Sequence, residues 1–309
     1  MTRRELAFYT CILLAMGAGW GATQPLSKIA VSEGYRHFGL IFWQLLISAV
    51  VLGTVSALRG KRLGLSRAQL GVYAVIALIG TIVPNSASYQ AIRELPSGVI
   101  SILLSIIPMI AFPIALALQL ERFNLRRFAG LAVGLVGVLL LVLPDASLPD
   151  PAMLAWIPLA LVAPLCYAFE GNYVAKWGTA GLDPIQALFG ASLFGSVVTL
   201  PLAIATRQFI SPFPPWTAPD YALIGASVIH AIVYTAYVWL VGRAGPVFAI
   251  QVSYAVTGFG VVWAMLLLGE SYSPFIWAAM LLILGGVFLV QPKKKDTLAA
   301  PAPIGEDAA

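Results

Sequence analysis

The stretch ERFNLRRFAGLAVGLVGVLLL, residues 121–141, places a short basic turn directly before a long apolar run. A helix that crosses a bilayer needs roughly 20 mostly apolar residues. The stretch ESYSPFIWAAMLLILGGVFLV, residues 270–290, has the same layout 149 positions later and matches at six positions. Asn124 and Ser273 fit helix N-caps, and Pro274 fits a first turn. The pair therefore indicates an internal repeat that carries one such helix at the end of each copy.

Ten apolar runs of this kind follow one another along the chain. The chain is 60% hydrophobic and 10% charged, whereas soluble domains carry about a quarter charged residues. The sequence therefore predicts an all-α integral membrane protein with ten transmembrane helices in a lipid bilayer. We expect the N-terminal run to be retained as the first span and not cleaved as a signal peptide. The runs are 6–30, 37–57, 69–91, 97–119, 126–143, 154–175, 184–206, 220–241, 246–268 and 274–291.

Basic residues divide unequally between the ends of these runs. Of the 18 Lys and Arg residues, 14 lie at the N-terminus, in alternate connections and in the tail, while three lie in the other connections. Lys and Arg concentrate on the cytoplasmic side of membranes. The pattern predicts a cytoplasmic (inner) membrane protein with both termini in the cytoplasm. The 14 are Arg3, Arg4, Arg59, Lys61, Arg62, Arg67, Arg122, Arg126, Arg127, Lys176, Arg243, Lys293, Lys294 and Lys295, and the three are Arg36, Arg93 and Arg207.

Each half of the chain holds five spans, which is an odd number. The second half must therefore enter the membrane in the opposite sense to the first. Inverted repeats of this kind underlie alternating access in many secondary transporters, which bind substrate near the midplane. We expect a first five-helix repeat at 1–147, a second, inverted repeat at 148–291, and a disordered cytoplasmic tail at 292–309.

Three stretches carry a family resemblance. They are GWGATQPLSKIA (19–30), RELPSGVISILLSIIPMIAFPIALALQLERFNLRRFAGLAVGLVGVLLLV (93–142) and RAGPVFAIQVSYAVTGFGVVWAMLLLGESYSPFIWAAMLLILGGVFLV (243–290). The chain resembles the ten-helix EamA-type exporters of the drug/metabolite transporter superfamily. The resemblance implies export of small metabolites, amino acids or drugs through a cavity lined by spans 1, 3, 4, 6, 8 and 9. That family usually has Gly-Glu after helices four and nine. Gly269-Glu270 conforms and Leu120-Glu121 does not, which we interpret as a difference in a loop and capping feature.

Polar residues inside a bilayer are costly and often functional. In the eighth span, His230, Tyr234 and Tyr237 are spaced i, i+4, i+7 and share one helical face. The repeat offset aligns them with three residues of the third span, which are Thr81, Asn85 and Ser88. Two stripes related in this way are expected to face each other across a substrate cavity. The alternative is that His230 bonds within its own helix while the tyrosines only pack.

Spans one, four and nine offer further polar residues. Ser101 and Ser105 are spaced i, i+4, and Gln251, Tyr254 and Gly258 are spaced i, i+3, i+7, so each set shares one helical face. Small residues at helix interfaces also allow close packing, so packing remains the alternative for these spans. The candidate substrate-contacting residues on them are Trp20, Gln24, Ser101, Ser105, Gln251 and Tyr254.

Proline removes a backbone hydrogen bond and kinks a helix. We therefore predict hinges at Pro25, Pro108 and Pro113, with Gly258 in the corresponding place of the ninth span. The glycines of the first span (Gly17, Gly19 and Gly21) predict either tight packing or an unwound turn.

Two residues are candidates for proton coupling. Glu170 is the only acidic residue well inside a span, and a buried carboxylate can have its pKa raised toward neutrality. The alternative for Glu170 is an interfacial pair with Lys176 or Arg243. His230 is the second candidate, because histidine titrates near neutral pH. Lys28, near the external end of its span, is expected to snorkel rather than to bind substrate.

The function expected from these observations is secondary transport that exports small metabolites, with a small molecule as substrate. A nucleotide-sugar or phosphate-ester carrier would need Lys or Arg in the cavity, and a non-transporting sensor or scaffold would lack a wet cavity. The absence of a Walker-type loop argues against an ATP-driven pump, and scattered single acidic residues argue against a metal-dependent transferase. Neither GAS motif (190–192, 225–227) fits a membrane serine protease, so no enzymatic activity is expected. No cofactor, metal or nucleic-acid partner is expected, and a homodimer is left open.

Overall fold

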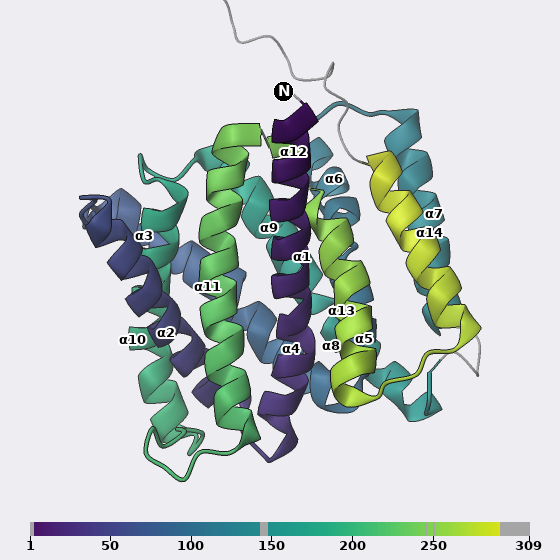
Figure 1. Ribbon diagram of the computed structural model, residues 1–309. Coiled ribbons are helices and arrows are strands. Elements are labelled where there is room, and N and C mark those ends of the chain that lie inside the picture. Colours follow the sequence, from purple (N-terminus) through teal and green to yellow (C-terminus); the bar gives the residue numbers. More distant parts are fainter. Residues whose placement is uncertain (1–2, 143–147, 245, 250, 291–309) are drawn as a thin grey trace, which may run out of the picture.

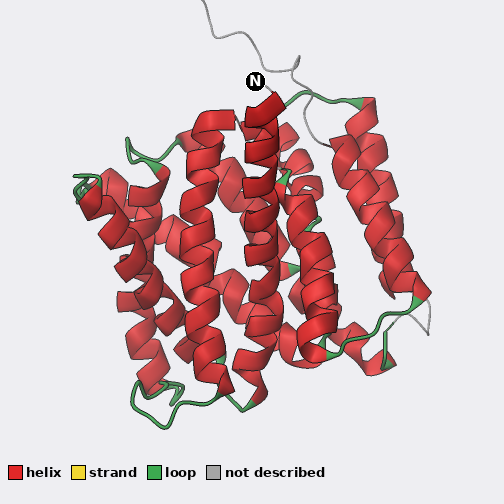
Figure 2. Cartoon of the chain, in the orientation of Figure 1, coloured by secondary structure: helices red, strands yellow, loops and turns green. Residues whose placement is uncertain are grey.

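The computed structural model describes residues 3–142, 148–244, 246–249 and 251–290, and within this part every regular element is a helix (Figure 2). Seven helical segments are long and apolar enough to cross a membrane, and Val252–Leu268 and Pro274–Val290 are shorter apolar helices. The chain is thus an all-helical, multi-pass membrane protein, as predicted. The seven segments are Arg3–Ser32, His37–Leu58, Arg67–Glu94, Ser97–Ala117, Pro151–Trp177, Pro184–Ala205 and Ala218–Ala244.

Helices occupy each of the ten apolar runs, although the number of membrane crossings stays a prediction. The predicted repeat boundary at 147 and the predicted tail lie at or within 143–147 and 291–309, outside the described residues. The elements are α1 (Arg3–Ser32), α2 (His37–Leu58), α3 (Arg67–Ala77), η1 (Leu78–Ile82), α4 (Val83–Glu94), α5 (Ser97–Leu104), α6 (Ile107–Ala117), α7 (Leu125–Val142), η2 (Pro151–Trp156), α8 (Ile157–Ala160), α9 (Val162–Trp177), α10 (Pro184–Ala205), α11 (Ala218–Ala244), α12 (Pro246–Ala249), α13 (Val252–Leu268) and α14 (Pro274–Val290).

Side-chain caps fix where several helices begin. The predicted N-cap Asn124 is confirmed, because its Oδ1 accepts hydrogen bonds from the backbone N–H groups of Arg126 and Arg127. Pro274 is the first residue of α14, as predicted. Asp183 caps α10 in the same manner and also completes a capping box. Such caps satisfy N–H groups that a helix cannot pair internally.

Several of the long segments are interrupted. A π-helical turn, η1, separates α3 from α4. The fourth span breaks between Leu104 and Ile107, where the predicted kink residue Pro108 lies in the first turn of α6. In the second half α12 ends at Ala249 and α13 begins at Val252. α13 continues through Gly258, so a hinge at this glycine stays a prediction.

The first helix is continuous, so the alternative of an unwound turn at its glycines is wrong. A Cβ built on Gly17 would lie 2.3 Å from Ala255 Cβ, and one on Gly21 would lie 2.8 Å from the Gly260 nitrogen. These glycines let α1 approach α13 closely, which is the expected role of small residues between membrane helices. Pro25 is buried inside α1, which extends unbroken across it.

The helices pack in a consistent pattern. In Figure 1, α1 lies between α11 and α13, while α7 and α14 form a pair at one side. The contacts of α1 with α13 and α11 have counterparts in those of α9 with α6 and α4. Likewise, the contact of α10 with α3 has a counterpart in the contact of α2 with α11. Two further contacts, α2 with α10 and α7 with α14, each join a helix to its own counterpart in the other half.

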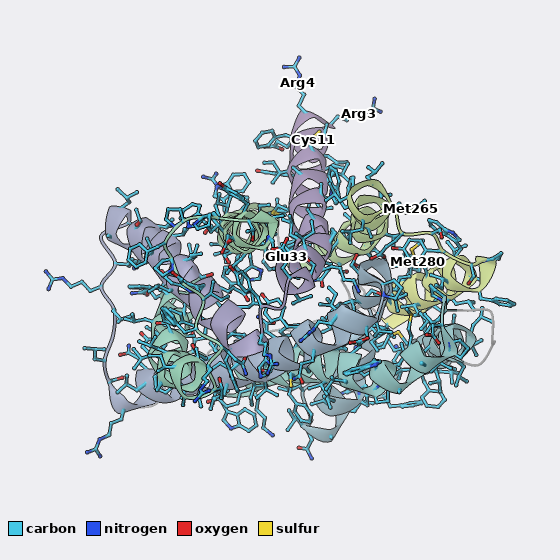
Figure 3. All side chains as sticks on the ribbon, turned by 90° about the horizontal axis from the view of Figure 1, so that it is seen from below. Arg3, Arg4, Cys11, Glu33, Met265 and Met280 are labelled. Atoms are coloured by element: carbon cyan, nitrogen blue, oxygen red, sulfur yellow. The ribbon has the colours of Figure 1, made fainter. Side chains whose placement is uncertain are left out.

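The bundle has two distinct ends. In Figure 1 the N-terminus and the α2–α3 connection lie at the upper end, and the α10–α11 connection lies at the lower end. Arg3 and Arg4 project from the start of α1, whereas Glu33 lies beyond its other end (Figure 3). A salt bridge of 3.2 Å between Arg59 and Asp183 joins two connections at the upper end. The Lys/Arg-rich connections therefore gather at one end of the molecule.

Candidate functional site

A chain of polar side chains crosses the interior between α2, α4 and α9. The hydroxyl of Tyr167 donates to Asn85 Oδ1 at 3.1 Å, and Asn85 Nδ2 donates to Gln44 Oε1 at 2.9 Å. The hydroxyl of Tyr89 donates to the same Gln44 oxygen at 2.9 Å. Hydrogen bonds in an apolar interior are retained because an unpaired polar group there is costly. The four residues thus form a connected intramembrane network, which we call the amide network.

Asn85 was predicted to lie in the site, but Gln44, Tyr89 and Tyr167 were not. Gln44 is the only amide or charged residue between Phe38 and Leu58, so it was the signal that could have led to the second span. The two tyrosines resemble any buried aromatic in sequence. Their roles become visible only where three helices meet.

Glu170 lies one turn after Tyr167 on α9 and approaches the π-helical turn. A Cβ built on Gly80 would lie 2.6 Å from Glu170 Oε1 and 2.8 Å from Oε2, so the carboxylate occupies the space that a side chain at position 80 would take. Neither Lys176 nor Arg243 pairs with this carboxylate: Lys176 Nζ donates to the Leu118 carbonyl at 3.2 Å, and Arg243 lies over the Trp239 ring. The alternative of an interfacial ion pair at Glu170 is therefore wrong.

The aromatic stripe of α11 turns toward the first helix. The ring centroids of Trp20 and His230 are 6.0 Å apart, and those of Trp20 and Tyr237 are 5.6 Å apart. Trp20 Nε1 is buried and has no hydrogen-bond partner.

The two predicted stripes thus do not pair with each other through hydrogen bonds. Asn85 bonds to α2 and α9, while His230 lies against α1. Glu170 lies against the Gly80 turn, beside the first of these stripes. Thr81 belongs to the π-helical turn itself, and Ser88 lies three residues beyond Asn85 on α4.

The polar residues of the fourth and ninth spans have local partners. Ser101 and Ser105 are buried and donate to the carbonyls of Ser97 and Ile102 in their own helix. A Cβ built on Gly260 would lie 2.5 Å from Ser101 Oγ, so this serine lies in the close contact between α5 and α13. This geometry favours the packing alternative for Ser101 and Ser105.

The remaining candidates differ in exposure. Gln251 is exposed at the start of α13, and Gln24 is half-buried in α1. The hydroxyl of Tyr254 is buried without a hydrogen-bond partner. Pro113 lies inside α6, which continues across it. Substrate contact by these residues stays a prediction.

A pocket of about 520 Å³ lies at the lower end of the bundle, away from the amide network. It is lined by residues that include Lys28, Arg93 and Glu270. Lys28 Nζ donates to the carbonyls of Arg93 and Leu95 at 2.9 and 3.0 Å. This cation thus reaches along its helix to satisfy the free carbonyls at the end of α4, as expected for a snorkelling lysine.

Glu270 joins the two halves of the chain at this end. Its Oε1 accepts hydrogen bonds from the Ser97 backbone N–H and hydroxyl at 2.7 and 2.9 Å, and its Oε2 accepts from Gly98 N–H at 3.2 Å and from the Tyr272 hydroxyl. We call this arrangement the Glu270 cap. The capping role predicted for this glutamate is confirmed, although the helix that it caps, α5, belongs to the other half. Glu121, its counterpart, pairs with Arg127 at 2.8 Å.

A multi-pass helical bundle with polar groups held in its interior is an architecture that membrane transporters use, and the comparisons with known proteins identify the class. The EamA-like transporter family matches residues 7–143 and again residues 154–291, so the chain belongs to this family. The uncharacterized transporter YvbV of Bacillus subtilis is 26% identical over 97% of both chains. The uncharacterized inner membrane transporter YedA of Escherichia coli (strain K12) is 23% identical over 100% of this chain and 99% of YedA. A crystal structure aligns with a TM-score of 0.62 at 18% identity, covering 91% of this chain and 97% of that chain, which shows a shared fold.

Proposed function

We propose that this EamA-family transporter is a secondary exporter of small metabolites, amino acids or related compounds and drugs among them. Export proceeds by alternating access across the cytoplasmic membrane. Ten crossings form two inverted five-helix repeats, and both termini lie in the cytoplasm. The observation that carries the proposal is the convergence of both halves on one set of interior polar groups. Gln44 and Asn85 come from the first half, and Tyr167 and Glu170 come from the second.

The packing pattern supports the inverted repeats. If the two halves are exchanged, α1 takes the place of α9, α11 that of α4, and α13 that of α6. Under this exchange the contacts of α1 become those of α9, and the α2–α10 and α7–α14 pairs map onto themselves. An interface of this kind allows one half to rock against the other around a fixed central site.

The unequal distribution of basic residues supports the orientation. The Lys/Arg-rich connections gather at the end where α1 begins, and Lys and Arg concentrate in cytoplasmic loops. The export direction follows from the family resemblance.

Cysteine accessibility tests the water-filled path that transport requires. Cys11 and Cys166 are first replaced by alanine, and Asn85, His230 and Tyr234 are then changed to cysteine one at a time. We expect at least one of these positions to react with a membrane-impermeant thiol reagent from one side. If none reacts from either side, the chain is not a transporter of this kind and a sensor or scaffold role takes its place.

Two exposed cysteine positions and one buried position serve as controls for that experiment. Lys61→Cys lies in the α2–α3 connection and Phe213→Cys in the α10–α11 connection, and these exposed positions report the two faces of the membrane. Leu52 is fully buried, so Leu52→Cys reports background reaction. Amino-acid uptake into proteoliposomes under an imposed pH gradient, in Glu170→Gln and His230→Ala variants, then tests the two coupling candidates.

A further inference from the structure

The surroundings of Glu170 point to a ligand of defined charge. Within the part of the chain that the structure describes, the Glu170 carboxylate has no hydrogen bond and no ion pair, although its side chain is half-buried among helices. A buried charge without a partner is strongly unfavourable. Lys176, the described cation closest to Glu170 along the chain, donates instead to the Leu118 carbonyl. The carboxylate therefore lies in a site where a positive charge is missing.

The π-helical turn opposite this carboxylate lies close against it. Gly80 has no side chain, which lets the Glu170 oxygens approach the backbone of Leu78–Ile82. Helix irregularities of this type recur at functional sites. The unpaired carboxylate thus lies against an irregular turn of the third span.

One aromatic residue lies next to Glu170 on its own helix. Tyr167 is one turn before Glu170 on α9, and its hydroxyl is held by Asn85. A group that binds here would meet one negative charge close to the amide network.

We propose that Glu170 and the Gly80 turn form the binding site for a primary ammonium group of the transported substrate. This inference rests on the proposed transport function and narrows it to substrates that carry an amine, such as amino acids and organic amines. An ammonium donates three hydrogen bonds and carries one positive charge. Those donors match the two carboxylate oxygens, and the charge matches Glu170.

Protection from carbodiimide labelling tests the site directly. Dicyclohexylcarbodiimide attacks carboxyl groups in apolar surroundings, and mass spectrometry of the labelled peptide reports modification of Glu170. The probes are phenethylamine and 2-phenylethanol, which are similar in size but differ in charge. In the purified wild-type protein we expect phenethylamine to lower Glu170 labelling at least fivefold. We expect 2-phenylethanol to change it less than twofold.

Two glycine variants separate the site from general effects. In Gly80→Ala the added Cβ would lie 2.6 Å from Glu170 Oε1, so the flexible carboxylate must move and protection by the amine should fall at least threefold. Gly71 lies on α3 in the same span and has no atom within 4 Å of a built Cβ. Gly71→Ala should therefore behave as the wild type.

The outcomes distinguish this proposal from the transport function. If Glu170 is labelled and both probes protect it equally, or neither does, the ammonium site is wrong. If Glu170 is not labelled at any pH between 5 and 8, the accessible carboxylate that the site requires is absent and the proposal is also wrong. Either result leaves the cysteine-accessibility test untouched, because that test does not involve Glu170.

Discussion

The Glu270 cap is predicted to hold the two halves of the chain together at the lower end of the bundle. Ser97 and Gly98 are buried at the start of α5, and two of their N–H groups donate to the Glu270 carboxylate. An N–H group of this kind that loses its acceptor costs about 1–3 kcal/mol. Water can enter the adjoining pocket, which reduces that penalty. We therefore expect Glu270→Ala to destabilise the protein by about 2–4 kcal/mol.

Thermal unfolding of the purified protein in detergent measures this effect. At about 2–4 °C per kcal/mol, Glu270→Ala should lower Tm by roughly 4–16 °C. The Tm of Glu270→Gln should lie between those of the wild type and Glu270→Ala. Its amide keeps one acceptor oxygen but turns an NH2 donor toward Gly98 and Tyr272. Burial, together with the hydrogen bond to Glu270, raises the pKa of the Tyr272 hydroxyl, so it remains a donor at neutral pH.

An exposed carboxylate at the same end serves as the matched control. Glu33 lies in the α1–α2 connection and is exposed, so Glu33→Ala should change stability by less than about 0.5 kcal/mol. If Glu270→Ala unfolds within 1 °C of Glu33→Ala, the reasoning about this cap is refuted.

Two further predictions concern packing and pH. A Cβ at Gly17 would lie 2.3 Å from Ala255 Cβ. Gly17→Leu should therefore separate α1 from α13 and abolish the monodisperse peak in size-exclusion chromatography. Gly258→Ala is the control and should keep that peak, because a Cβ at Gly258 meets no atom within 4 Å. Burial alone would raise the pKa of Asp183, but its backbone hydrogen bonds and the Arg59 guanidinium outweigh burial and lower it below 3.8. The resulting stabilisation, about 1 kcal/mol, is fully present above the pKa of the unfolded state. It is lost as the pH falls through the lower folded value, so the difference in Tm between the wild type and Asp183→Asn should vanish on acidification.

The sequence predicted the helical class and the limits of its segments because these depend on local chemistry. Apolar runs, the cap at Asn124 and the first-turn proline at Pro274 each act over a few residues. For Lys28 the structure shows hydrogen bonds to the carbonyls at the end of α4, while snorkelling to the membrane surface stays a prediction. The family resemblance was confirmed by the match over both halves of the chain.

The candidate site was predicted only in part, because it depends on which helical faces meet. The offset between repeats aligned Asn85 with Tyr234, but it could not show that Asn85 bonds to Gln44 and Tyr167. The hinge at Gly258 stays a prediction for a related reason. A repeat in sequence does not require that both copies break at the same residue, and α13 is continuous at Gly258.

The π-helical turn at Leu78–Ile82 sets the rotation of everything that follows it in the third span. Each residue of an α-helix advances the side-chain direction by about 100°. A chain one residue shorter at this turn would form a regular helix, and Asn85 and Tyr89 would then point away from Gln44. Among relatives, the insertion or loss of one residue at this turn would therefore change which face of α4 points toward Gln44.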